Sequence, residues 1–216
     1  MTFIFALARP EMGVVAADVS SSRRTYALHV RPLVDGWVTS TGTASAAASC
    51  GLAIYQALDA GPVRADVLGE LIVAHTDGVA GFLGFLGVST DGAAVRMRSW
   101  DASGARHDPR LFGRATQPWF SSVPPELAPV EREADALCDL CRRDLEQTAD
   151  AHAWVERVTT LVAELYGLAA RSWPPESEVG PFISICGRAE IGLVFRDGRR
   201  FYRGPRDDQA REFRPC

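Results

Sequence analysis

The chain has 216 residues, of which 47% are hydrophobic and 23% charged, and its formal net charge is −4. This length suits one large domain or two small ones, and the composition is typical of a globular protein. No apolar run approaches the ~20 residues of a membrane span, and no basic stripe is present, which argues against membrane and nucleic-acid partners. The start lacks the basic segment of a signal peptide, so we expect a reducing, cytoplasmic setting.

Apolar runs and turn sequences predict a β-meander at the N-terminus. Residues 2–8 are continuously apolar, as in a strand covered on both faces. A turn leads into a second short strand over 14–17. Strands over 26–34 and 37–41 then flank Asp35-Gly36, a sequence that favours a tight hairpin.

Helices and strands alternate in the rest of the chain. Apolar residues at helical spacing predict helices over 46–60 and 63–76, separated by Gly61-Pro62. The turn sequence Asp91-Gly92 predicts a hairpin. Residues 104–129 show no period and form a long irregular connection. The remaining predicted elements are strands over 82–88, 93–100, 182–186, 191–195 and 199–203, and helices over 130–147 and 152–171.

Cysteines and histidines give no metal signature. The five cysteines are odd in number and irregularly spaced, unlike a disulfide framework. Cys138 and Cys141 lack the second ligand pair of a zinc site, so they are either small residues of a helix core or, as the lesser alternative, a redox pair. His75 lies on an apolar helical stripe and is interpreted as a satisfied histidine at the rim of the core. We expect no metal and no organic cofactor.

Common catalytic signatures are also missing. The sequence contains no phosphate-binding G-x-x-x-x-G-K-[ST], no dinucleotide G-x-G-x-x-G after a strand, no H-E-x-x-H and no G-x-S-x-G. Thr2 offers another kind of chemistry, because removal of Met1 would expose a hydroxyl and a free α-amine on one residue. That amine titrates near pH ~7.7–8.0 and can accept the proton of the hydroxyl.

The segments Thr2-Phe-Ile-Phe-Ala and Gly13-Val-Val-Ala-Ala-Asp18 resemble the start of proteasome β-subunits, which are N-terminal-nucleophile (Ntn) hydrolases. Residues 37–50, 82–88 and 100–104 are similar to the strand, turn, first helix and central hairpin of that family. The resemblance covers most of 2–104 and, more weakly, 150–204.

The resemblance implies a fold and a set of site residues. The fold would be α+β, a four-layer αββα sandwich of two antiparallel sheets between helical layers, formed by a single domain over 1–204 and followed by a charged tail over 205–216. Thr2 would be the nucleophile. Asp18 would hold the basic residue that lowers the pKa of the Thr2 hydroxyl. That basic residue is a lysine in the family, and the matching position here is Arg31. The backbone N–H of Ser45 would form the oxyanion hole. His29, two residues before Arg31, is a candidate substitute proton carrier.

The implied function is hydrolysis of peptide or amide bonds by an N-terminal threonine, in a homo-oligomer that could be a ring. Three alternatives remain. The chain could be an inactive scaffold or binding protein with the same fold, because arginine cannot release a proton at neutral pH. It could be an amidase acting on small amides. Without the family pattern, it is an equally good interpretation that Asp18 is a turn residue at the end of a strand and that Arg31 is its surface ion partner.

Overall fold

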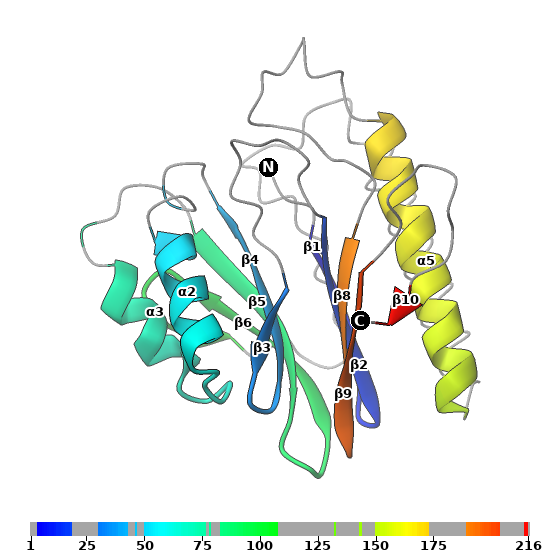
Figure 1. Cartoon of the computed structure of the whole chain (residues 1–216), viewed down its shortest axis with the longest axis horizontal. Coiled ribbons are helices and arrows are strands. Elements are labelled where there is room, and N and C mark those ends of the chain that lie inside the picture. The colour runs from blue at the N-terminus through cyan, green and yellow to red at the C-terminus, as the bar shows by residue number, and fades with distance from the viewer. Residues whose placement is uncertain are drawn as a thin grey trace.

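The computed structural model describes residues 4–18, 30–42, 46, 50–76, 78, 83–107, 132, 143, 150–172, 189–203 and 214–215. Within these ranges the strands form two antiparallel five-stranded sheets (Figure 1). The first sheet has the order β1-β2-β8-β9-β10 and the second β3-β4-β5-β6-β7. The first comprises β1 (Ile4–Arg9), β2 (Met12–Asp18), β8 (Ala189–Phe195), β9 (Gly198–Arg203) and β10 (Arg214–Pro215). The second comprises β3 (Arg31–Leu33), β4 (Gly36–Gly42), β5 (Leu83–Thr90), β6 (Val95–Asp101) and β7 (Arg106–His107).

The two sheets pack face to face around an apolar core. Because side chains alternate along a strand, every second residue of β1, β2, β5 and β6 points into this core. The residues that meet there include Ile4, Ala6, Val15, Ala17, Leu86, Val88, Val95, Met97 and Val194. Trp37 of β4 packs against the same cluster and donates its indole N–H to the Leu193 carbonyl oxygen at 3.1 Å. The sheets are therefore joined by both apolar contacts and a side-chain hydrogen bond.

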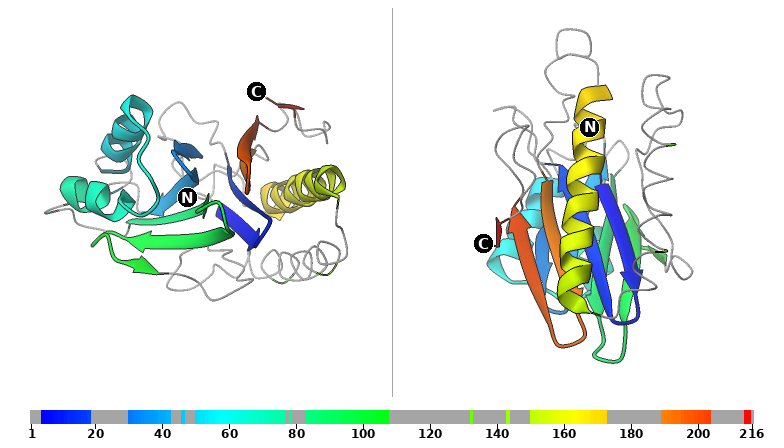
Figure 2. Two further views of the ribbon diagram at one scale, coloured as in Figure 1. Left: turned by 90° about the horizontal axis from the view of Figure 1, so that it is seen from below. Right: turned by 90° about the vertical axis from the view of Figure 1, so that its right-hand side faces the viewer.

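Helices lie on the outer sides of the sheets (Figure 2). A second core cluster joins α2 (Leu52–Ala60) and α3 (Leu68–Thr76) to the second sheet. Its members include Leu33, Val38, Cys50, Ile54, Leu58, Leu68, Ile72, Phe85 and Trp100. The long helix α5 (Ala151–Ser172) lies along the first sheet and contacts β2 and β8, with Val155, Leu161 and Val162 buried. The chain is thus an α+β protein with two antiparallel sheets. None of the helices in the described ranges combines the length and apolarity needed to cross a bilayer.

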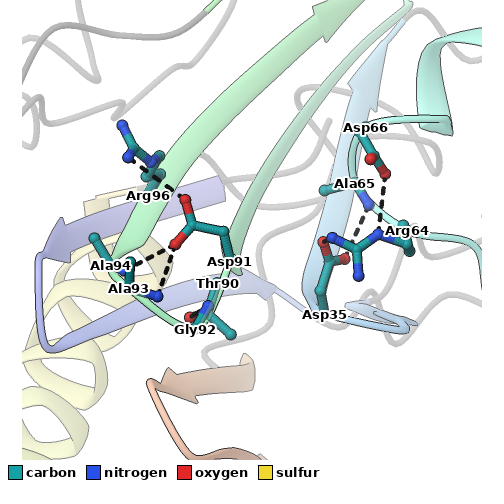
Figure 3. Close-up of polar contacts among 10 residues, drawn as sticks. All are labelled: Asp35, Arg64, Ala65, Asp66, Thr90, Asp91, Gly92, Ala93, Ala94 and Arg96. Carbon is teal, nitrogen blue, oxygen red and sulfur yellow. Dashed lines mark hydrogen bonds and ion pairs between the residues drawn. The ribbon is translucent and has the colours of Figure 1, made fainter.

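The hairpin turns gather at one end of the structure, which we call the turn end. The N–H of Val95 donates to the Pro10 carbonyl at 2.9 Å, which joins the β1–β2 and β5–β6 turns. The N–H of Thr90 donates to the Asp35 carbonyl at 2.8 Å, and Asp35 also accepts a bond from the N–H of Ala65 (Figure 3). The starts of β1, β5 and β8 and the ends of β2 and β4 lie at the opposite end.

Several predicted elements are confirmed with shifted bounds. The strands over 14–17, 37–41, 82–88, 93–100, 191–195 and 199–203 correspond to β2, β4, β5, β6, β8 and β9, and the helix over 152–171 to α5. Of the strand predicted over 26–34, the structure describes Val30, β3 and Val34, and Val34 lies in the turn after β3. The strand predicted over 182–186 and all of 130–147 except residues 132 and 143 lie outside the described ranges.

Two predictions needed correction. The helix predicted over 63–76 begins only at Leu68, because Val63 and Ala65 are bonded to the β3–β4 turn. The segment 104–129 was predicted to be irregular, yet its start contains the short strand β7 beside β6. Within the charged tail predicted over 205–216, Arg214 and Pro215 form β10, which pairs with β9.

Candidate functional site

The structure describes only part of the predicted site. Thr2, Ser45 and His29 lie outside the described residues. The backbone of Asp18 is described and ends β2, whereas its side chain is not. Arg31 is described in full and begins β3 in the second sheet.

Strand pairing brings the relevant backbone segments together at the end opposite the turns. Ile4 of β1 pairs with Ala17 of β2, so β1 starts beside the end of β2. On the other side of β2, Ala17 pairs with Glu190 and Asp18 with Ala189. The start of β1, the end of β2 and the start of β8 therefore adjoin one another.

A buried carboxylate connects this region of the first sheet to the second sheet. Glu190 is 1% exposed, and its Oε2 accepts a 3.1 Å hydrogen bond from the N–H of Val30, which is 2% exposed. Ionised groups are costly to bury unless they are hydrogen-bonded, and a bond to a charged acceptor is stronger than a neutral one. This contact fixes Val30, and hence the residue that follows it, against β8.

The side chain of Arg31 points towards α2. Its Nε lies 3.1 Å from Oδ1 of Asp59, and its guanidinium lies 4.9 Å from the ring centroid of Tyr55. The Nε atom is buried and makes no aligned hydrogen bond within the described part of the chain, so its contact with Asp59 is an ion pair without hydrogen-bond geometry. Stacking on an aromatic ring adds a cation–π attraction. Arg31 is therefore already engaged on the helix side of β3.

Tyr55 is a fixed, neutral partner in this contact. Its side chain is buried and its hydroxyl lies 3.0 Å from Oγ of Ser40 on β4. Burial raises the pKa of Tyr55 to about 12, with the hydrogen bond to Ser40 acting in the opposite direction. The phenol therefore keeps its proton throughout the physiological range and cannot act as a base there.

The far end of β3 is also held by the first sheet. The guanidinium of Arg199 on β9 donates to the Leu33 carbonyl oxygen and lies 5.3 Å from the ring centroid of Trp37. With the Val30–Glu190 bond, β3 is attached to the first sheet before its first residue and at its last. An edge strand of three residues is thereby fixed in place by side chains of β8 and β9.

Sequence reasoning missed three participants: Glu190, Asp59 and Tyr55. Glu190 carried a signal, because it is a charged residue at an inward position of the otherwise apolar strand β8. Asp59 and Tyr55 carried none, since nothing in the spacing of α2 indicates a partner on β3. The interpretation of His75 is confirmed: its Nδ1 donates to the Leu71 carbonyl at 2.9 Å at a half-buried position.

Two comparisons with known proteins, one with family models and one with curated sequences, identified no relative of this chain. Among the described residues, no three His, Cys, Asp or Glu side chains form a group that could hold a metal ion. Evidence on function therefore comes from the sequence pattern around Thr2 and Asp18 and from the pairing of β1, β2 and β8.

Proposed function

We propose that this chain is a proteasome-like hydrolase that cleaves peptide or amide bonds with Thr2, after removal of Met1. The observation that carries the proposal is the pairing of Ile4 with Ala17. Thr2, the proposed nucleophile, precedes Ile4 by two residues in the sequence, and Asp18 directly follows Ala17. In sequence, Thr2 therefore precedes the start of β1 by two residues, and Asp18 ends β2, the strand that pairs with β1.

The proposed reaction uses one residue as nucleophile and base. The α-amine of Thr2 accepts the hydroxyl proton while Oγ attacks the carbonyl carbon of the amide. The backbone N–H of Ser45 stabilises the oxyanion that forms, an interaction of the kind that is often the largest single contribution to such catalysis. The amine proton passes to the leaving nitrogen, and water then hydrolyses the threonine ester.

In this proposal the αββα sandwich of the Ntn hydrolases is the fold. Two features support it: α2 and α3 pack on the outer side of the second sheet, and α5 contacts the first sheet. The two sheets share one apolar core between them. By analogy with the same family, we propose a cytoplasmic homo-oligomer, which could be a ring and which needs no cofactor.

Arg31 would supply positive charge near Asp18. A chain of contacts supports this role: Asp18 follows Ala17, Ala17 pairs with Glu190, and Glu190 binds the N–H of Val30 beside Arg31. An arginine keeps its charge at all relevant pH values, so it can act only through its field.

A second candidate is an inactive protein of the same fold that serves as a scaffold or binding protein. The position of the Arg31 guanidinium favours it, because that group is paired with Asp59 and stacked on Tyr55. A guanidinium held in this way would have to leave both partners to approach Asp18.

Intact mass and covalent labelling test the proposal. The purified protein is expected to lack one methionine, and a threonine-reactive epoxyketone or β-lactone is expected to modify Thr2. Thr2→Ala should abolish labelling, and Thr2→Ser should retain it. Retention of Met1 would rule out this mechanism, because the α-amine would then be on the wrong residue. Loss of Met1 without labelling would favour the inactive scaffold.

A further inference from the structure

We propose that Glu190 is a positioning residue of the proposed hydrolase site: its carboxylate fixes the start of β3 against the first sheet and so determines where Arg31 lies. The inference rests on the proposed function and adds a residue to it. Glu190 acts through the backbone of Val30 and not on the substrate.

The Glu190 side chain is buried between the two sheets. Among the residues that the structure describes, Glu190 is the one charged residue that is fully buried, at 1% exposure. It pairs with Ala17, whose side chain lies in the core between the sheets, so Glu190 also points inward. A well-packed apolar side chain is often as stabilising as a buried charge or more so. The other inward positions of β8 carry no charge: they are Gly192, which lies against Trp37, and Val194, which belongs to the apolar core.

The Glu190 carboxylate binds a backbone group of the opposite sheet. Glu190 Oε2 accepts the N–H of Val30 at 3.1 Å, although the two residues are 160 positions apart in the chain. Val30 precedes β3, which has three residues and which, among the strands that the structure describes, pairs only with β4. A buried N–H without an acceptor is costly, so this bond selects one position for the start of β3.

Glu190 also lies at the end of the first sheet where the proposed site is expected. Glu190 occupies the first described inward position of β8, at the end where β1 begins and β2 finishes. The bond therefore spans the two sheets between Asp18 and Arg31, the two residues whose relative placement the proposed chemistry requires. The hydrogen bond that joins Trp37 to Leu193 fixes the sheets farther along β4 and β8.

Two conservative variants separate position from charge. Glu190→Gln keeps an oxygen of the same reach that can accept the N–H of Val30, but it removes the charge. Glu190→Asp keeps the charge and withdraws the carboxylate by one methylene. Ser89→Ala is the matched control, because Ser89 is also buried in the second sheet but lies near the turn end, and its Oγ makes no hydrogen bond to any residue that the structure describes.

The readout is the rate of Thr2 labelling by an epoxyketone, resolved into the inhibitor's affinity and its maximal rate. Glu190→Asp is expected to lower the maximal rate by roughly tenfold, as loss of one buried hydrogen bond would. The inhibitor's affinity should change less than the rate. Glu190→Gln and Ser89→Ala should label at about the wild-type rate. Amide hydrogen exchange over residues 30–33 should accelerate in Glu190→Asp and not in Glu190→Gln.

Each contrary result has a distinct meaning. A wild-type chain that is never labelled would overturn the hydrolase proposal and this role with it. Normal labelling of Glu190→Asp, with a labelled wild type, would overturn the positioning role alone. Loss of labelling in Glu190→Gln but not in Glu190→Asp would also overturn it, because charge and not placement would then be what matters.

Discussion

Trp37 of β4 lies directly against Gly192 of β8. A Cβ atom on Gly192 would lie far inside van der Waals contact with Cγ of Trp37. The indole is also fixed by its bond to the Leu193 carbonyl and by the ring of Phe201, whose centroid is 5.2 Å away. The absence of a side chain at residue 192 is what lets the tryptophan lie between the sheets.

Substitution of Gly192 by alanine is therefore expected to destabilise the fold. The indole must shift and its hydrogen bond lengthen, at a cost of about 1–3 kcal/mol in the free energy of unfolding. Urea denaturation measures this cost. Gly198→Ala is the control, since a Cβ there would have no atom within 4 Å and should change stability by less than about 0.5 kcal/mol. Equal effects of the two substitutions would contradict the packing argument.

Release of Arg31 from its ion pair tests whether Asp59 restrains it. The pair is partly exposed, with the Asp59 side chain 54% accessible, so Asp59→Asn should cost only about 0.2–1 kcal/mol of stability. If the hydrolase proposal holds, freeing the guanidinium should raise the rate of Thr2 labelling by up to roughly fivefold, the rate equivalent of ~1 kcal/mol.

The matched control for this variant is Asp66→Asn. Asp66 lies 3.4 Å from Arg64 in an exposed ion pair on the segment between α2 and α3 (Figure 3). The Asp66→Asn substitution should leave the rate of Thr2 labelling unchanged. A lower labelling rate in Asp59→Asn would show that the pair with Asp59 supports the site instead of competing with it.

Tyr55 predicts a loss of stability at alkaline pH. Burial raises its pKa to about 12 in the folded chain from an ordinary value of 10.0, so the folded state favours the neutral phenol. This preference stabilises the folded state by about 2–3 kcal/mol. The stabilisation is fully present below pH ~10 and is lost as the pH rises towards ~12. Tyr55→Phe should be less stable near neutral pH, by about 0.5–1.5 kcal/mol for the bond to Ser40.

Urea unfolding at a series of alkaline pH values separates these effects. The wild type should lose stability faster than Tyr55→Phe, and the order of the two should reverse above about pH 11. Ser40→Ala serves as a control, because it removes the hydrogen bond and keeps the phenol. Parallel pH profiles for wild type and Tyr55→Phe would contradict the raised pKa.

Asp91 predicts a loss of stability in acid. Its carboxylate accepts 2.9 Å bonds from the N–H groups of Ala93 and Ala94 and lies 3.5 Å from Arg96. The bonds from Ala94 and Ala93 lower the pKa of Asp91, with a smaller contribution from Arg96. A lowered carboxyl pKa stabilises the fold above its ordinary value of 3.8, and this contribution disappears as the pH falls through the lowered pKa.

Thermal melts between pH 7 and pH 2 would reveal this contribution. Asp91→Asn should be less stable than wild type at neutral pH and should converge with it in acid. Arg96→Gln should alter the profile less, because the backbone bonds dominate the shift. A constant difference between wild type and Asp91→Asn at all pH values would refute the assignment.

The hairpins were predictable because their signals are local. Asp35-Gly36 and Asp91-Gly92 stand between apolar runs, and Gly92 has a φ of 85°, which glycine adopts at little cost. Cys50, Ile54 and Leu58 are buried as their helical spacing predicted. The start of α3 was not predictable, because the bond from Ala65 to Asp35 overrides a helical pattern with a contact 30 residues away.

The candidate site was less accessible to prediction for the same reason. The position of Arg31 could be proposed from a family pattern, but its pairing with Asp59 depends on how α2 packs against β3. The bond between Val30 and Glu190 spans 160 residues, and no periodicity encodes it. The one signal in the sequence was the charged residue Glu190 within an otherwise apolar strand, which indicates that its carboxylate has a hydrogen-bond partner in the core.

The order of strands in the first sheet has a consequence for synthesis on the ribosome. β2 pairs with β8, so the sheet cannot close until more than 170 residues beyond β2 have emerged. Contacts so distant in sequence slow folding, since a long loop must close before they form. A nascent chain arrested before Ala189 would display β2 as an open edge with unpaired amides, which is a surface that chaperones must protect from aggregation.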